Sequence, residues 1–434
     1  MKKENNNAGR ICIDEVLILQ NKIKINYRVD GEIKKYFYDI GSFDIEYSIN
    51  IENLPKSIAI VPFVTNVLPL IWITDSVLEI NELDADFYSC IGDLKTGYIN
   101  MYPQLDFEGK IRVKEVIKND RSTVDKVATF FSGGVDAFST LISHIDETPE
   151  LFTLWGNDIL YDNQSGWKNV EKHIEKTAEQ FNLNFIYAKT NFRCFLREES
   201  LNKLVKIVDD SWWHGFQHGI GLIGHAAPYV YINKINHIYI ASTYTIKDKG
   251  KVTCASDPTI DNYVRFCDCK VTHDQYELSR QDKLENICSF AKREKQDIEL
   301  RVSYQSHIGY NCCNCEKCYR TILGLLAEKV DPQKFGFTYS KDKLRNIVED
   351  IKREMIIPKS CIPLWKDIQL KFLQNMNHWR DDEDLNWILY VDFDQINSTV
   401  FKKQKILMNK IKANIKYLIH WESLKMKFRL IRKW

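Results

Sequence analysis

A glycine turn between a buried strand and an amphipathic helix is the feature that most constrains the fold of this chain. Residues 127–131 (VATFF) form a continuous apolar run, which is typical of a strand covered on both faces. After the turn, apolar side chains recur at the spacing of one helix face, at Phe138, Leu141, Ile142 and Ile145. The pattern predicts a strand, a tight turn and a helix in direct succession.

The turn has the chemistry of a phosphate-binding loop, and it consists of Ser132, Gly133, Gly134, Val135 and Asp136. The start of a helix presents unpaired N–H groups and the positive end of the peptide dipole. Two glycines let the backbone approach a phosphate closely, and the serine adds a hydroxyl donor. We expect the aspartate either to cap the helix or to help hold Mg²⁺. The alternative is a plain turn without a ligand.

Strands and helices alternate along the middle of the chain. Short apolar stretches lie at 151–155, 185–188 and 237–241, and they alternate with helical patterns at 170–181, 201–208 and 213–227. Such alternation predicts an α/β fold with a Rossmann-like parallel sheet covered by helices on both faces.

We expect three parts in the chain. Residues 1–124 form a β-rich accessory domain, because 23–29 and 43–49 alternate with the period of a half-buried strand. Residues 125–330 form an ATP-binding domain with a cysteine cluster. Residues 331–434 form a helical region with a basic tail, whose scattered aromatics (Trp365, Phe372, Trp379, Trp387 and Tyr390) we expect in the core.

The glycine turn, with Phe131 before it, resembles the PP-loop of the ATP pyrophosphatases. The resemblance implies the adenine nucleotide alpha-hydrolase-like fold. It also implies cleavage of ATP between the α- and β-phosphates, adenylation of a substrate oxygen and release of pyrophosphate. The residue after the aspartate is usually serine in that family and is Ala137 here, and Ser139 is a candidate to replace its hydroxyl.

Three cysteines have the spacing of a metal site. Cys312, Cys315 and Cys318 form C-x₂-C-x₂-C, and thiolates at this spacing can close on one tetrahedral Zn²⁺. Lys317 and Arg320 lie close enough in sequence to offset the thiolate charge. The alternatives are redox thiols or no metal. With no export signal at residues 1–10, we expect the twelve cysteines to be reduced.

The surroundings of this cluster, residues 314–321, resemble the zinc segment of the 7-cyano-7-deazaguanine synthases, a PP-loop family. That family has a further cysteine a few residues upstream, where this chain has Ser303. The fourth zinc ligand is therefore open among four candidates, which are Cys313, His307, Cys267 and Cys269.

Side chains between the two motifs are candidates for catalysis and for substrate binding. Arg280 and Lys283 share one helix face, so that two cations could neutralise phosphate or a substrate carboxylate. An exposed helix with ordinary surface charge is the alternative. Ser242 follows a strand and should lie at the carboxyl edge of the sheet, where ligands bind in open α/β folds.

The resemblance suggests further positions. Ser256 and Asp261 lie in a segment similar to one between loop and zinc cluster in proteins like the deazaguanine synthases, and we take them as substrate residues. The resemblance also implies that the strand end at Gly156 and Asp158 meets the adenine and ribose of ATP. His214 and His218 share a predicted helix face, but we expect a structural role because no third metal ligand is nearby.

The charge distribution bears on partners. The chain as a whole has a net charge of +1, yet residues 401–434 have nine Lys, two Arg and one Glu. Such a tail can contact an RNA or protein acceptor, or it can be a solvated helix face. The most apolar run, at 58–73, is interrupted by prolines and is too short for a membrane span. We expect a cytoplasmic protein, with a homodimer as one candidate for its assembly.

These observations predict an ATP-dependent adenylating enzyme with ATP, Mg²⁺ and Zn²⁺ as cofactors. The small-molecule acceptor would be a carboxylate or carbonyl, a deazapurine in the resembled family, and ammonia or another nucleophile would then displace AMP. Two alternatives remain: an ATP-dependent enzyme that modifies a tRNA base, and a scaffold protein that binds nucleotide without turnover.

Overall fold

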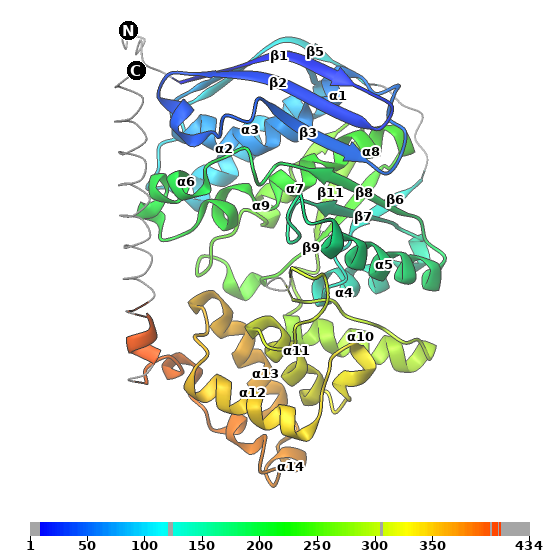
Figure 1. Ribbon diagram of the computed structural model, residues 1–434, viewed down its shortest axis with the longest axis vertical. Helices are drawn as coiled ribbons and strands as arrows, with labels where there is room; N and C mark the ends of the chain where they lie inside the picture. The colour runs from blue at the N-terminus through cyan, green and yellow to red at the C-terminus, as the bar shows by residue number, and fades with distance from the viewer. Residues whose placement is uncertain (1–8, 120–124, 304–306, 400–401, 407, 409–434) are drawn as a thin grey trace. The chain divides into compact units, whose positions relative to one another are not determined.

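The computed structural model describes residues 9–119, 125–303, 307–399, 402–406 and 408. The chain forms two compact units, Met1–Cys312 and Cys313–Trp434. The first unit is built on one mostly parallel sheet of eleven strands, and the elements of the second unit are helices (Figure 1). The expected α/β class is confirmed.

Five parallel strands form the part of the sheet that holds the glycine turn. Their order across the sheet is β11-β9-β6-β7-β8. Strand β6 therefore lies in the middle, and the chain winds outward on both sides of it, as in a Rossmann-type sheet. The strands are β6 (Val127–Phe130), β7 (Glu150–Trp155), β8 (Phe185–Thr190), β9 (His237–Ala241) and β11 (Cys269–Asp274).

The remaining strands extend this sheet in both directions. The two-residue strand β10 pairs with β11, and β3 pairs antiparallel with β8 so that the sheet continues through β2, β1, β4 and β5. The bounds are β1 (Arg10–Ile18), β2 (Lys22–Asp30), β3 (Ser42–Tyr47), β4 (Val77–Asp84), β5 (Lys110–Ile117) and β10 (Arg265–Phe266).

The first 124 residues differ from the β-rich domain expected from the sequence. They contain three helices among their strands, and α2 (Val61–Ile73) occupies the proline-containing apolar run. Pro62 is tolerated there because it lies in the first turn of the helix, where its missing N–H costs nothing. The strands of this segment belong to the same sheet as β6–β9. The boundary between the two compact units falls between Cys312 and Cys313.

Helices cover the sheet of the first unit. Helices α1, α2 and α3 pack on β4, and α10 packs on α4 beside β9. Their bounds are α1 (Lys56–Ala59), α2 (Val61–Ile73), α3 (Ala85–Met101), α4 (Val135–Ser143), α5 (Gln164–Phe181), α6 (Glu198–Leu204), α7 (Ile220–Gly224), α8 (Ala226–Asn233), α9 (Pro258–Asp261) and α10 (Arg280–Glu294), with a π-helix, η4 (Trp213–Gln217), and short 3₁₀ turns η1 (Glu32–Tyr36), η2 (Ile145–Glu147), η3 (Lys206–Val208) and η5 (Ile246–Asp248).

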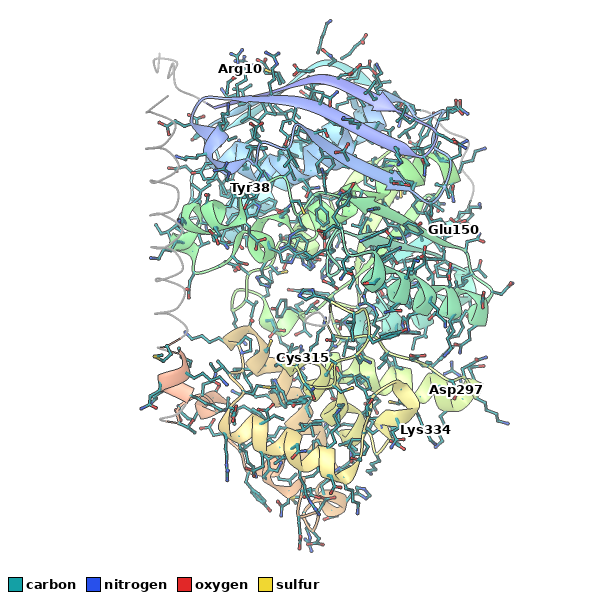
Figure 2. All side chains as sticks on the ribbon, in the orientation of Figure 1. Arg10, Tyr38, Glu150, Asp297, Cys315 and Lys334 are labelled. Carbon is teal, nitrogen blue, oxygen red and sulfur yellow. The ribbon has the colours of Figure 1, made fainter. Side chains whose placement is uncertain are left out.

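A buried carboxylate holds the start of β7. Glu150, labelled in Figure 2, accepts hydrogen bonds from the Tyr229 hydroxyl at 2.8 Å and from Asn233 at 3.0 Å. Both donors come from α8, so the acid ties this helix to the amino end of the strand. Such pairing is what a buried charge requires, because an unpaired one is costly.

The second unit is helical as far as the structure describes it. Its core contains Trp365, Phe372 and Trp379, as expected, but Tyr390 is exposed and Trp387 only partly buried. The elements are α11 (Glu316–Ala327), α12 (Lys341–Arg353), α13 (Ile362–Gln374) and α14 (Met376–Trp379), with 3₁₀ turns η6 (Pro332–Phe335), η7 (Lys359–Cys361), η8 (Asn386–Leu389) and η9 (Phe393–Gln395). Most of the basic tail lies outside the described residues.

Within the described part of the chain, no helix combines the length and the apolar character needed to cross a membrane.

Candidate functional site

The glycine turn lies at the carboxyl end of β6, at the point where the strand order reverses. Strand β6 pairs with β7 on one side and with β9 on the other, and successive strands move outward from there. Crevices at such switch points are where open α/β folds bind their ligands. The turn therefore lies at the edge of the sheet where such folds bind ligands.

The turn leads directly into α4. Gly134 is the N-cap residue, with φ −80° and ψ 170°, and Val135 begins the helix. Gly133 has φ +77°, and a Cβ at this position would lie 2.5 Å from Nε2 of His173. Glycine is therefore required at 133 for two independent reasons, backbone conformation and space. Asp136 is the second residue of α4 and not its N-cap.

Arg301 donates two hydrogen bonds to the turn, and the sequence contained no sign of this contact. Its backbone N–H donates to the carbonyl of Gly133 at 2.7 Å, and its Nε donates to the carbonyl of Ser132 at 3.0 Å. Burial lowers the pKa of Arg301, and the charge of Asp158 opposes this effect. Arg301 therefore holds both carbonyls and fixes the backbone of the turn at Ser132 and Gly133.

His173, on α5, is the second neighbour of the turn that the sequence did not reveal. Burial, together with the charge of Arg301, lowers its pKa to about 4. The imidazole is therefore neutral near pH 7. Its Nε2 is buried and has no hydrogen-bond partner among the described residues. No sequence signal marked this histidine, because its helix reads as an ordinary amphipathic one.

Asp136 is held by the two cations that the sequence proposed. Nη1 of Arg280 donates to Oδ2 of Asp136 at 2.6 Å, and Nζ of Lys283 lies 3.8 Å from Oδ1. The Arg280 side chain is 4% exposed and that of Lys283 is fully buried. The alternative of an exposed helix with surface charge is thus excluded for these positions. Two basic side chains therefore face one carboxylate beside the turn.

Lys283 also reaches the end of β9. Its Nζ donates to the carbonyl and to the hydroxyl of Ser242, the latter at 2.8 Å, and the Ser242 hydroxyl donates to the carbonyl of Gln275 at 2.7 Å. Burial lowers the pKa of Lys283, while Asp136 opposes this effect. Ser242 directly follows β9, and the buried Lys283 side chain joins α10, α4 and the end of β9.

Ser139 does not replace a hydroxyl of the turn. It lies one helical turn further on, is fully buried, and its carbonyl accepts a bond from Nε2 of Gln275 at 3.1 Å. Its hydroxyl has no partner among the described residues. Of these two serines, only Ser132 belongs to the turn.

The strand end at Gly156 lies at the same edge. Gly156 has φ +118°, and a Cβ there would lie 2.1 Å from the carbonyl oxygen of Thr190. Asp158 follows in an exposed position. The two residues expected near adenine and ribose thus come from β7, the neighbour of β6.

Ser256 and Asp261 form a separate buried cluster. Asp261 is fully buried, accepts a bond from the Ser256 hydroxyl at 2.7 Å and pairs with Nδ1 of His273 at 2.9 Å. His273 and Asp274 are successive residues of β11 and so point to opposite faces of the sheet. Asp274 contacts His144, just after α4, so His273 and Asp261 lie on the face away from α4. These contacts anchor the segment, and the role of Ser256 and Asp261 as substrate residues stays a prediction.

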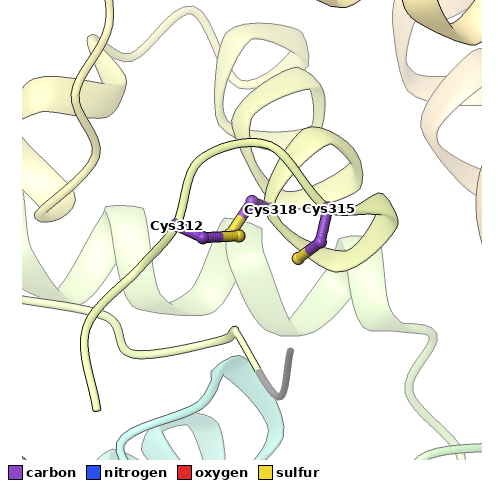
Figure 3. Close-up of side chains that lie close together, drawn as sticks. All are labelled: Cys312, Cys315 and Cys318. Atoms are coloured by element: carbon purple, nitrogen blue, oxygen red, sulfur yellow. The ribbon is translucent and has the colours of Figure 1, made fainter. Parts of the chain in front are cut away.

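The three cysteines of the predicted metal site do come together. The sulfur atoms of Cys312, Cys315 and Cys318 lie within 4.8 Å of one another, around the start of α11 (Figure 3). Three thiol ligands at this separation fit a tetrahedral metal ion, as zinc requires. Arg320, expected to offset thiolate charge, instead pairs with Glu316 at 2.9 Å.

Ser303 lies beside the group of three cysteines. Its hydroxyl donates to Sγ of Cys312 at 3.2 Å, and the identity of a fourth ligand stays a prediction. Of the other candidates, Cys267 and Cys269 belong to the β10–β11 hairpin and His307 is exposed. Cys313 interacts with Cys318 and is not part of the group of three thiols.

Comparison of the sequence with models of protein families gave no match, and comparison with curated proteins gave none either.

The turn geometry predicts an unequal response of two glycines to alanine. Gly133 and Gly41 have almost the same φ, +77° and +78°, but the space beside Gly41 is open. We expect Gly41→Ala to lower the free energy of unfolding by about 1 kcal/mol, the cost of the backbone conformation. We expect about 2–4 kcal/mol for Gly133→Ala, because the clash with His173 is added. Denaturant unfolding checks this, and equal losses would contradict the packing described.

The metal site predicts the effect of two changes at one position. Ser303→Cys should tighten zinc binding by about tenfold or more, because a fourth thiolate replaces a poor ligand. Ser303→Ala should leave the zinc content unchanged if the three cysteines suffice. Both are measured by zinc loss to a competing chelator. Weaker binding in Ser303→Cys would show that position 303 does not face the metal.

Proposed function

We propose that the chain is an ATP-dependent adenylating enzyme that cleaves ATP to AMP and pyrophosphate. The observation that carries the proposal is the placement of the glycine turn at the sheet switch point, with Asp136, Arg280 and Lys283 beside it. A plain structural turn has no need of two buried cations, whose burial is costly unless they serve a charge.

Each part of this site has a role in the proposed reaction. The amides of the turn would bind the β- and γ-phosphates, and Asp136 would hold Mg²⁺, which supplies charge neutralisation. Arg280 and Lys283 would stabilise the negative charge that builds up as pyrophosphate leaves. Buried side chains suit this task because they are already oriented, and the protein contributes positioning and charge.

The proposed reaction has two steps. An oxygen of a substrate carboxylate attacks the α-phosphorus of ATP, a new P–O bond forms, and the bond to the β-phosphate breaks. The product is an acyl adenylate. A nitrogen nucleophile then attacks the acyl carbon, and AMP leaves. The resemblance of the glycine turn and the cysteine segment to deazaguanine synthases supports 7-carboxy-7-deazaguanine as the first substrate to try, with Zn²⁺ in a structural role.

The test is a direct assay of products. The protein is incubated with Mg²⁺ and α-labelled ATP, with and without 7-carboxy-7-deazaguanine and ammonium, and AMP and pyrophosphate are measured. We expect Asp136→Ala and Arg280→Gln to reduce AMP release by a factor of about 100 or more, because each removes charge at the reacting phosphates.

Matched variants control for general damage. Asp146→Ala and Arg293→Gln change exposed residues near the end of α4 and on α10, and they should retain full activity. AMP release only after addition of cell extract would keep the mechanism and move the acceptor to another molecule. Binding of ATP without AMP under any condition would overturn the proposed function and favour a nucleotide-binding scaffold.

A further inference from the structure

A second group of reactive side chains surrounds the π-helix η4, beyond the carboxyl end of β9. It consists of Asp210, His214, His218, Tyr244 and Cys254, three of which precede, occupy or follow the π-helix. π-Helical turns are rare and occur frequently at functional sites. Tyr244 is two residues past Ser242, so this group lies at the same edge of the sheet as the Lys283 contact.

His214 is held on both sides of its ring. Its Nδ1 lies 3.0 Å from Oδ1 of Asp210, and its Nε2 lies 3.3 Å from the Tyr244 hydroxyl. Asp210 in turn accepts bonds from the Tyr102 hydroxyl at 3.0 Å and from the Thr253 hydroxyl at 2.7 Å. A carboxylate that orients an imidazole in this way is the second half of a nucleophile–base–carboxylate arrangement.

Cys254 is fixed between two histidines. The residues on each side of it are anchored, because Thr253 bonds to Asp210 and the Ala255 N–H donates to the carbonyl of His214 at 2.8 Å. Its sulfur lies 3.8 Å from Nδ1 of His218. The thiol therefore sits between a carboxylate-bound imidazole and a second imidazole.

Two glycines make this close approach possible. A Cβ on Gly215 would lie 2.7 Å from Oδ2 of Asp210, and a Cβ on Gly219 would lie 2.6 Å from the carbonyl oxygen of Ala255. Any larger residue at either position would push the Cys254 segment or Asp210 away. The bonds of Ser256 to Asp261 hold the other end of the same segment.

The electrostatics of the group favour a charged imidazole. Burial lowers the pKa of His214, but hydrogen bonds with Asp210 and Cys254 and their charges outweigh it and raise the pKa to about 10. The groups that face the ring are Asp210, Tyr244 and Cys254. The group thus places a proton-carrying imidazole beside a thiol, an arrangement that nucleophilic cysteines use.

We propose that Cys254 is a catalytic nucleophile that accepts the acyl group from the adenylated substrate as a thioester, with His214 as its proton partner and Asp210 as the residue that positions His214. The proposal rests on the proposed adenylating function. It adds a covalent step between activation and attack by the amine.

The step balances as follows. The Cys254 thiolate attacks the acyl carbon of the adenylate, a C–S bond forms, and the bond from the acyl carbon to the phosphate oxygen breaks, so that AMP leaves with the electron pair. An amine then attacks the thioester carbon, a C–N bond forms, and the C–S bond breaks to return the thiolate. The proton lost by the amine passes to His218, the second imidazole beside the sulfur. No oxidant or reductant is needed.

The first test measures the reactivity of the thiol without any substrate. The intact protein is treated with limiting iodoacetamide at pH 6.5, and alkylation of each cysteine is followed by peptide mass spectrometry. Cys194 is the internal control, because it is exposed and lies outside the group around η4. Cys254 is itself buried, so the comparison is made between two proteins: we expect Asp210→Asn to slow the alkylation of Cys254 by at least about tenfold and to leave that of Cys194 unchanged. No alkylation of Cys254 in the unsubstituted protein, or the same rate in Asp210→Asn with unchanged circular dichroism, overturns the proposal.

The second test separates this step from adenylation. Cys254→Ser should keep substrate-dependent ATP–pyrophosphate exchange within about twofold and lose amide formation by about a hundredfold, because the hydroxyl is a far weaker nucleophile. Unchanged amide formation in Cys254→Ser overturns the covalent step while leaving the adenylating function in place. Absence of exchange in the unsubstituted protein contradicts the adenylating function itself, and with it the acyl transfer, whereas the iodoacetamide result is independent of both.

Discussion

The arrangement of the glycine turn depends on the contacts of one buried side chain, that of Lys283. It lies 3.8 Å from the carboxylate of Asp136 and donates to the carbonyl and hydroxyl of Ser242, so that one side chain fixes the start of α4 against the end of β9. A fully buried cation is stable only where such partners surround it. The geometry of the turn at the switch point is therefore coupled to this side chain.

The sequence contained enough information for the centre of the fold but not for its extent. Local patterns predicted three successive elements, β6, the turn and α4. These patterns are the apolar run at 127–131, the glycines after it and the helical period of Phe138 and Leu141, in that order. Local patterns do not say which strands pair, however. The pairing of β3 with β8 joins Ile45 to Thr190, and such a long-range contact has no local signature. The same limit explains the missed helices of the first 124 residues, where proline in an apolar run suggested an interruption.

The site itself was predictable only in part, for related reasons. Charged residues at helical spacing identified Arg280 and Lys283, and cysteine spacing identified the three thiols. His173 and Arg301 lie far from the turn in sequence and contact it only because α5 and the strand-like segment before the cysteines pack behind it. Ser256 and Asp261 were predicted to bind substrate from a resemblance alone, and the sequence contained no sign that they bond to each other and, through Asp261, to His273.

The claim on which the account depends is that the turn at Ser132–Asp136 binds the phosphates of ATP. A crystal structure of the protein with Mg²⁺ and α,β-methylene-ATP, which cannot be cleaved between these phosphates, tests it most directly. We expect the β- and γ-phosphates to bind to the amides of Gly133, Gly134 and Val135. We expect the metal ion on Asp136 and the adenine near Gly156. An analogue bound elsewhere, with the turn occupied by no phosphate at saturating concentration, would contradict it.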